Sequence, residues 1–280
     1  MNSTVSFNDF LEFERAVFGD EYPIAAYDPA LIRYGEYRFA LESLPFQPGQ
    51  TVLDLGCEAN IFLLYLAYRG CRLIGVDVDP NVWRSLEERK KRVEKVFGQT
   101  LDVTFKADDA TRLTAPPDSV DGVIAISSIE HMFSPHGHGD QLAIESIARV
   151  LKPGGAAVVT VPMSNGTPFH EAPKGDKRFA GPYRLYTPEV LRKRYLSDPA
   201  LELVRFSYLA NSTPDVRFDQ MHFHLFWLQK LKHQDRAKWA WAQPILAGVF
   251  NPIISVEEGV AQVYRLNTAL ICFRKRVSFR

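Results

Sequence analysis

The sequence predicts an α/β fold built on a doubly wound, mostly parallel sheet of seven strands, with an N-terminal helical cap and a C-terminal insertion. Between residues 51 and 162, short apolar runs bounded by turn residues alternate with helical segments. Short connections between alternating strands and helices are typical of a parallel sheet with helices on both faces. The 280 residues are 46% hydrophobic and 24% charged, which excludes disorder and coiled coil and is enough for a packed core.

Two helices are predicted before the first strand. Apolar and aromatic residues recur at helical spacing over residues 5–18 and 28–44, and the turn 47–50 closes this segment. We therefore expect residues 1–48 to form a helical cap.

Five strands and three helices follow in alternation. Gly70 suits a left-handed cap at the end of the first helix, and Asp79 and Pro80 suit the N-cap and first position of the second. One face of the second helix is apolar and is predicted to face the core: Val82, Leu86, Val93 and Val96. The predicted strands are 51–55, 71–77, 101–107, 119–127 and 156–162, and the predicted helices are 60–68, 80–97 and 141–151.

The pattern loosens after Pro162. Residues 163–186 predict a long loop, Thr187 opens a helix that ends near residue 196, and two further strands are predicted at 201–210 and 266–276. The connection between these strands, about 211–265, is far longer than usual, so we expect an insertion with its own role. It contains most of the tryptophans and a predicted amphipathic helix at 217–239.

Charge and cysteine content limit the classes of partner. The chain has 33 basic and 33 acidic residues, so a strongly basic nucleic-acid footprint is absent. No apolar run is long enough to span a bilayer, although Trp227, Trp239 and Trp241 leave peripheral membrane contact open. Cys57, Cys71 and Cys272 lack the spacing of a zinc site, which predicts reduced thiols. With no secretory signal recognised, we expect a cytoplasmic protein.

The strongest functional signal is the segment VLDLGCEAN at 52–60. Asp54 lies near the end of a buried strand, Gly56 forms the turn, and a helix follows. Ligands of open α/β sheets bind where strand ends meet helix N-termini, near the point where strand order reverses. Asp77 ends the next strand about twenty residues later, where a carboxylate can accept both hydroxyls of a ribose. The pair predicts a nucleoside-containing cofactor.

A nicotinamide-dependent oxidoreductase is one alternative, and the glycine spacing disfavours it. A dinucleotide fingerprint needs G-x-G-x-x-G, whereas Glu58 occupies the second glycine position here. A buried Glu58 would also repel a pyrophosphate.

The order of motifs resembles that of class I S-adenosylmethionine-dependent methyltransferases, from about residue 51 to 162. After Asp54-x-Gly56 and Asp77 come Ala107-Asp108-Asp109-Ala110, then Ser128-Ile129-Glu130-His131, then Leu151-Lys152-Pro153-Gly154-Gly155. The resemblance implies the Rossmann-like methyltransferase fold and S-adenosyl-L-methionine as cofactor. It implies that Asp54, Gly56 and Cys57 hold the methionine end, Asp77 the ribose, Val78, Asp109 and Ala110 the adenine, and that Ser127 and Ser128 lie beneath the sulfonium.

The resemblance also implies a division of the chain. Residues 1–48 would be the cap, 49–165 the cofactor-binding core, 166–200 an acceptor-side loop and helix, and 201–280 the last strands with a helical lid inserted at about 211–265. The departures Glu58 and Asn60 from the glycine-rich turn motivate the other alternative, a catalytically inactive binding or partner protein on the same fold.

Methyl transfer from a sulfonium is an in-line displacement, so the protein mainly aligns the acceptor, excludes water and removes a proton. His131 is the candidate general base, with a backbone-bonded loop histidine as the alternative. His170, Arg184 and Tyr186 are candidates for binding the acceptor, although a surface ion pair would also explain Arg184. We predict no metal, because Glu130-His131 lacks a third ligand and the 136–140 segment lacks a ligand spacing.

We therefore expect transfer to a hydroxyl, or an amine, of a small molecule or glycan. An RNA acceptor is disfavoured because no basic surface or RNA-binding domain is evident. The sequence does not predict the oligomeric state.

Overall fold

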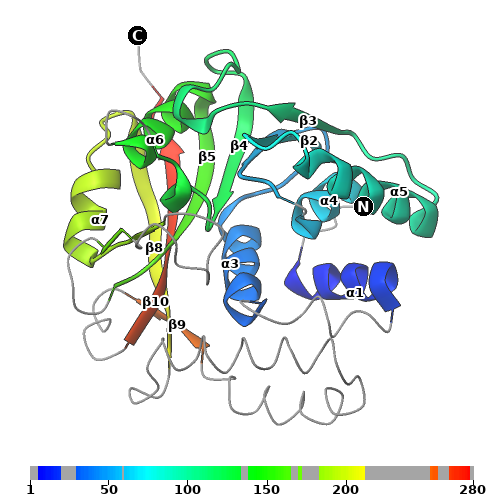
Figure 1. Cartoon of the computed structure of the whole chain (residues 1–280), viewed down its shortest axis with the longest axis horizontal. Helices are drawn as coiled ribbons and strands as arrows, with labels where there is room; N and C mark the ends of the chain where they lie inside the picture. Colours follow the sequence, from blue (N-terminus) through cyan, green and yellow to red (C-terminus); the bar gives the residue numbers. More distant parts are fainter. Residues whose placement is uncertain are drawn as a thin grey trace.

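The computed structural model describes residues 6–19, 30–58, 60–133, 138–164, 170–171, 183–211, 253–257 and 265–277. Its main sheet has the strand order β3-β2-β1-β4-β5-β10-β8-β9 (Figure 1). All seven predicted strands are present, and β9, which falls inside the predicted insertion, adds an eighth at one edge. The strands are β1 Thr51–Leu55, β2 Arg72–Asp77, β3 Val103–Ala107, β4 Val120–Ile126, β5 Leu151–Pro162, β8 Leu201–Asn211, β9 Ile253–Glu257 and β10 Arg265–Lys275.

The sheet is parallel through its first five strands and antiparallel beyond them. β1 pairs in parallel with β2 on one side and with β4 on the other, so the strand order reverses at β1. β10 lies between β5 and β8 and pairs antiparallel with both. Because ligands of such sheets bind at the reversal, the carboxyl ends of β1 and β4 are the place to look for a site.

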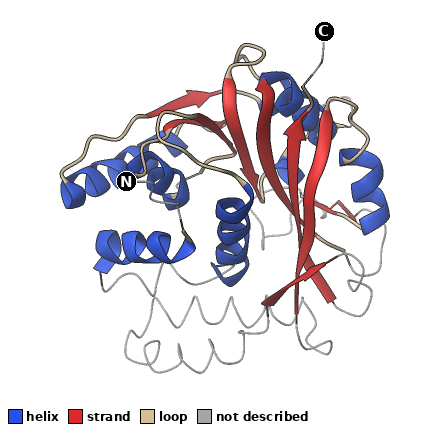
Figure 2. Cartoon of the chain, turned by 180° about the vertical axis from the view of Figure 1, so that it is seen from behind, coloured by secondary structure: helices blue, strands red, loops and turns tan. Residues whose placement is uncertain are grey.

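Helices cover both faces of the sheet, as both views show (Figures 1 and 2). Along β1 the side chains alternate between two cores: Val52 packs with one, and Leu53 and Leu55 with the other. The Val52 core contains α1 Phe7–Phe18, α3 Ala30–Ser43, α4 Ile61–Tyr68 and α5 Val82–Phe97. The opposite core contains α6 Gly139–Val150 and α7 Pro188–Tyr195, together with the short 3-10 turns η2 Ala110–Arg112 and η3 Ile129–His131.

Two details of α5 differ from the prediction. The helix begins at Val82 rather than at residue 80, because Asp79 accepts hydrogen bonds from the backbone and side-chain amides of Asn81 and so forms a preceding turn. Leu86 and Val93 are fully buried, whereas Val96 is 44% exposed. Val96 lies in the last turn of the helix, about 60° around the axis from Val93, which takes it off the buried stripe.

The segment predicted as a loop at 163–186 contains a small second sheet. β6 His170–Glu171 pairs antiparallel with β7 Arg184–Leu185, and Met163 forms a bridge to Tyr186. The predicted helix 217–239 lies outside the described residues, so the lid and the domain division stay predictions. The three cysteines are buried and free, in line with reduced thiols. Among the described helices, none is long and apolar enough to cross a membrane.

A buried carboxylate joins the helices of the second core. Asp140 of α6 is fully buried and accepts hydrogen bonds from the hydroxyls of Tyr186 (3.1 Å) and Tyr195 (3.2 Å). The Arg194 Nε donates to the same carboxylate at 2.8 Å. Although burial opposes the charge, the Arg194 hydrogen bonds and charge hold the pKa of Asp140 below its ordinary value. α7 is therefore fastened to α6 by an ionised group.

Replacing this carboxylate should destabilise the fold. We expect Asp140→Asn to lower the free energy of unfolding by about 3 kcal/mol, because Arg194 loses its charged partner in a buried setting. Chemical denaturation measures the change. Glu145→Gln, on an exposed position of the same helix, is the control and should stay within about 0.5 kcal/mol of the unaltered protein. Equal stabilities for the two variants would contradict the assigned role of Asp140.

Candidate functional site

Two cavities lie at the carboxyl ends of β1 and β4. The larger has a volume of about 710 Å³ and the smaller about 330 Å³. Gly56, Glu58 and Ser127 line both cavities, so the two meet at the turn that follows β1. This is the reversal point of the sheet, where the sequence predicts the site.

The turn after β1 requires glycine. Gly56 has a φ of +68°, and a Cβ atom on it would lie 2.6 Å from the Cβ of Ser128. The amides of Gly56 and Cys57 both donate to the carbonyl oxygen of Val76, at 2.8 and 3.1 Å. The turn is thus tied to the end of β2 and pressed against the segment that follows β4, with no room for a side chain.

Glu58 does not fill the site. Its side chain is exposed, and its φ of +38° is the left-handed conformation that glycine takes most easily. Its backbone amide donates to Asp77 Oδ2 at 3.4 Å. The backbone therefore keeps the course of a glycine-rich turn and directs the Glu58 carboxylate to the rim of both cavities.

The larger cavity gathers eight residues that the sequence predicts for the site. Val78 is 72% exposed beside it, a large apolar surface that a flat ring could cover. Asp77 accepts from the amide of Asp79 at 3.0 Å, and Asp109 caps η2 by accepting from the amide of Thr111 at 2.9 Å. The predicted residues lining this cavity are Gly56, Asp77, Val78, Asp109, Ala110, Ser127, Ser128 and His131.

Asp54 lies buried next to the turn and lines neither cavity. It is 2% exposed, and its Oδ2 has no hydrogen-bond partner among the described residues. Burial raises the pKa of Asp54 well above its ordinary value, and the Asp77 carboxylate adds to the rise. Cys57 lines the smaller cavity, and burial likewise raises the pKa of its thiol. A cation near the turn would find an unsatisfied acceptor in Asp54.

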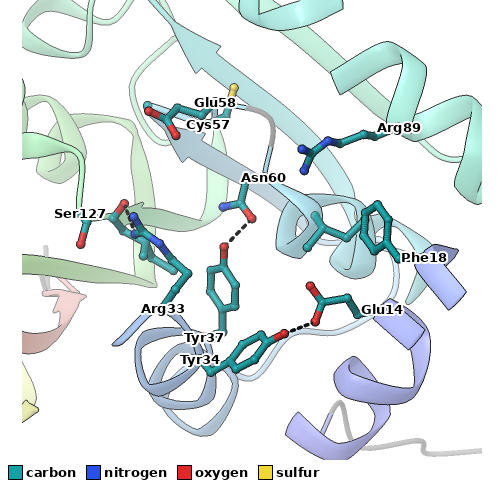
Figure 3. Close-up of a pocket in the computed structure, with 13 residues that line it drawn as sticks. Glu14, Phe18, Arg33, Tyr34, Tyr37, Cys57, Glu58, Asn60, Arg89 and Ser127 are labelled. Atoms are coloured by element: carbon teal, nitrogen blue, oxygen red, sulfur yellow. Dashed lines mark hydrogen bonds between the residues drawn. The ribbon is translucent and has the colours of Figure 1, made fainter. Parts of the chain in front are cut away.

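The smaller cavity lies between the N-terminal helices and the first turn of α4 (Figure 3). The Tyr34 hydroxyl donates to Glu14 Oε2 at 2.5 Å, and the Tyr37 hydroxyl donates to Asn60 Oδ1 at 2.9 Å. Burial raises the pKa of Glu14 to about 7, and the Tyr34 hydrogen bond limits that rise. Figure 3 shows Arg33 on the opposite wall, near Ser127. The cavity therefore offers both acidic and basic groups.

Arg33 of α3 is held from two directions. Its Nη1 donates to the carbonyl oxygen of Ile126 at 3.1 Å and lies 3.1 Å from Glu36 Oε2. Although burial opposes its charge, the Glu36 carboxylate raises the pKa of Arg33 above its ordinary value. Sequence reasoning missed Arg33, Glu14 and Tyr34, because no local motif marks them. The only signal was the prediction that their helices form a cap.

A family model described as a methyltransferase domain matches residues 53–159. The matched span includes the β1 turn, Asp77, Asp109 and the end of β4. Residues 53–159 are thus similar to a methyltransferase domain, and the motifs that resemble the class I S-adenosylmethionine-dependent methyltransferases lie within this span. The family match supports S-adenosylmethionine as the cofactor, as the sequence predicts.

Curated proteins match the core of this chain. An S-adenosyl-L-methionine-dependent Diels-Alderase of Talaromyces variabilis is 32% identical over 46% of this chain and 41% of its own. A ubiquinone biosynthesis O-methyltransferase of Xanthomonas campestris is 28% identical over 49% of this chain and 51% of its own. The chain thus spans about half the length of the curated relatives it matches.

Solved structures extend the likeness to most of the fold. A coclaurine N-methyltransferase bound to N-methylheliamine and SAH superimposes with a TM-score of 0.58 at 17% identity, covering 95% of this chain and 81% of that one. The [4+2]-cyclase SpnF gives 0.56 at 21% identity, covering 88% and 83%. At sequence identities this low, the comparison with solved structures establishes the fold alone.

Three observations show that the described residues fit S-adenosylmethionine. Gly56 leaves space that a Cβ would close, Asp54 Oδ2 is a buried acceptor without a hydrogen bond among the described residues, and the cavities on the two sides of the turn differ in character. The larger has apolar surface and, among the carboxylates that line it, Asp77 and Asp109 for a nucleoside. The smaller cavity is lined by both acidic and basic side chains, which suit the ammonium and the carboxylate of an amino-acid tail.

On the acceptor side, His131 lies at the larger cavity with 47% of its side chain exposed, and its Nε2 is 4.0 Å from Glu130 Oε1. Tyr186 is fully buried with its hydroxyl bonded to Asp140. Arg184 is 1% exposed, and its Nη1 donates to the carbonyl oxygen of Met132 at 2.8 Å. The backbone of His170 lies in β6. The acceptor roles of His131, His170, Arg184 and Tyr186 stay predictions.

No group of three or more metal-ligating side chains gathers within the part of the chain that the structure describes. Glu130 and His131 are adjacent without a third such group, and His136 lies outside the described residues.

The buried Glu130 should make stability depend on pH. Burial raises the pKa of Glu130 to about 8, with the Glu36 carboxylate adding to the rise. A carboxyl with a raised folded-state pKa stabilises fully below its unfolded value and loses that contribution as pH rises through about 8. The unaltered protein should therefore lose stability between about pH 6 and about pH 9. In the Glu130→Gln variant, this loss should be smaller by roughly 2 kcal/mol.

Denaturation curves at the two pH values measure this effect. Glu88→Gln, at an exposed position of α5, is the matched control and should leave the pH dependence unchanged. A Glu130→Gln variant that loses as much stability as the unaltered protein would show that Glu130 is already ionised near neutral pH.

Proposed function

We propose that the chain is an S-adenosylmethionine-dependent methyltransferase acting on a hydroxyl, or an amine, of a small molecule or glycan. The observation that carries the proposal is the pair of cavities joined at Gly56, one suited to a nucleoside and the other to a zwitterion. S-Adenosylmethionine has these two parts on either side of its sulfur. A protein that bound only a nucleotide would have no use for the second, mixed-charge cavity.

The nucleoside end would lie in the larger cavity. Asp77 has both carboxylate oxygens at the end of β2, each already holding one backbone amide and each with a further lone pair for a ribose hydroxyl. The exposed Val78 would pack on adenine, and Asp109 with Ala110 would face the edge of the ring.

The amino-acid end would lie in the smaller cavity. Arg33 supplies a cation for the carboxylate, and the turn at Gly56 and Cys57 supplies close backbone. The buried Asp54 would favour the ammonium or the sulfonium, because a nearby cation stabilises its ionised form. Glu58, at the rim, is compatible with binding in this arrangement.

When bound, the cofactor supplies an activated methyl group on a positively charged sulfur. The protein then has to align the acceptor, exclude water and take up a proton. His131 lines the larger cavity on the side of the β4 end and is the proposed base, with Ser127 and Ser128 beneath the reacting centre. We propose that α1 and α3 cover the bound cofactor and that the 211–265 insertion shapes the acceptor pocket.

Cofactor binding is the first test. We expect calorimetry to detect binding of S-adenosylhomocysteine, the demethylated cofactor. Asp77→Ala should weaken that binding about a hundredfold, because it removes two hydrogen bonds to a charged acceptor. Asp102→Ala, at an exposed ion pair with Arg72, is the control and should bind normally. Absence of binding to the unaltered protein would refute the proposed function, and an unaffected Asp77→Ala variant would refute the ribose assignment.

Turnover is the second test. A panel of phenols, aliphatic alcohols, amines and sugars should contain an acceptor that gains one methyl group while S-adenosylhomocysteine is released. His131→Ala should lower kcat about a hundredfold and leave cofactor affinity unchanged, since the general base acts on the acceptor. Binding without turnover across the panel would favour the inactive binding-protein alternative. An altered acceptor skeleton with the cofactor intact would instead indicate a cyclase.

A further inference from the structure

Glu36 is a fully buried carboxylate whose partners come from three separate elements. It belongs to α3 and is 0% exposed. Its Oε1 accepts from the Ser127 hydroxyl and from the Thr160 hydroxyl, each at 2.6 Å. Its Oε2 lies 3.1 Å from Nη1 of Arg33. One side chain thus connects the cap helix to the segments at the ends of β4 and β5.

Ser127 is held in an unfavourable backbone conformation by the same group. Its φ is +44°, in the left-handed region that a non-glycine residue seldom occupies. Its amide donates to Thr160 Oγ1 at 2.9 Å and to the Thr160 carbonyl at 3.1 Å, while its hydroxyl donates to Glu36. A strained backbone conformation persists only where the surrounding contacts hold it in place. Here Thr160 holds the backbone amide of Ser127, and Glu36 holds its hydroxyl.

Arg33 is oriented by the same carboxylate. Glu36 and the carbonyl of Ile126 both engage Nη1, which sets the guanidinium in the wall of the smaller cavity. Glu36 therefore contacts Arg33, which lines the smaller cavity, and Ser127, which lines both cavities where they meet. Glu36 itself lines neither cavity.

Docking of α3 does not require a buried charge. The Tyr37 ring stacks on Phe62 of α4 with centroids 4.5 Å apart, and Phe39 is 3% exposed within the same core. A buried ion pair contributes less to stability than apolar packing of similar volume, so the carboxylate is better explained by the orientation it imposes.

We propose that Glu36 is a positioning residue for the amino-acid tail of the cofactor: it fixes Arg33 and Ser127 in the geometry that the tail requires. The proposal rests on the proposed function, because it needs a cofactor bound across both cavities. It predicts an effect confined to ligands that have the tail. Loss of a purely structural group would weaken the binding of all ligands of the site by a similar factor.

The test compares two ligands by calorimetry. S-Adenosylhomocysteine has the amino-acid tail, and 5′-methylthioadenosine has the same nucleoside and sulfur without it. We expect Glu36→Gln to weaken binding of S-adenosylhomocysteine about tenfold or more, because Arg33 loses its charged partner, and to leave binding of methylthioadenosine within about twofold. Glu42→Gln is the matched control: it lies on α3 in an exposed pair with Arg38 and should change neither affinity.

A second variant tests the proposal in case Glu36→Gln does not fold. Thr160→Val keeps the shape of the side chain and removes one hydrogen bond to Glu36, so it should weaken S-adenosylhomocysteine about threefold and spare methylthioadenosine. If the unaltered protein binds neither ligand, the proposed function fails. If it binds both, and folded variants change the two affinities equally or not at all, the role of Glu36 is refuted while the proposed function stands.

Discussion

The contact between Gly56 and Ser128 is the constraint on which the site depends. It brings the turn after β1 against the segment after β4, closer than any side chain on residue 56 would permit. The same turn is hydrogen-bonded to the end of β2, which fixes where Asp77 lies. The two cavities exist because this narrow junction separates them while leaving both open to the strand ends. A larger residue at position 56 would push the β4 segment away and change both compartments together.

The electrostatics of the site follow from burial next to that junction. Asp54 and Glu130 are nearly inaccessible, and desolvation raises the pKa of each. Glu36 differs because two hydroxyls and a guanidinium surround its carboxylate. The Oε1 atom of Glu36 thus accepts two hydrogen bonds, and its Oε2 has the ion pair with Arg33. By contrast, Asp54 Oδ2 and Glu130 Oε2 have no hydrogen-bond partner among the described residues, and a nearby cation would favour their ionised forms.

Local sequence predicts the parts of the molecule that are local. The β1 strand, the helix that starts near residue 60 and the helix that Thr187 opens depend on residues a few positions apart, and the sequence predicts each of them. The positions of Asp77, which ends β2, and of Asp109, two residues after β3, follow from the predicted strands. Glu36 could not be found in this way, since its partner Ser127 is 91 positions away and meets it only after α3 docks. The exposure of Glu58 is likewise not evident from residue type, because it depends on the left-handed backbone at this position.

The acceptor side shows how a motif can be recognised and its role still be indirect. Arg184 and Tyr186 were singled out as groups facing an acceptor, yet their polar ends are directed at Met132 and Asp140 in a buried network. The Arg184 guanidinium also lies 3.9 Å from the centre of the Phe133 ring, and Phe133 lines the larger cavity. These residues therefore set the position of the cavity wall. A change at Arg184 would therefore reach the larger cavity through Met132 and Phe133, by altering the shape of this wall.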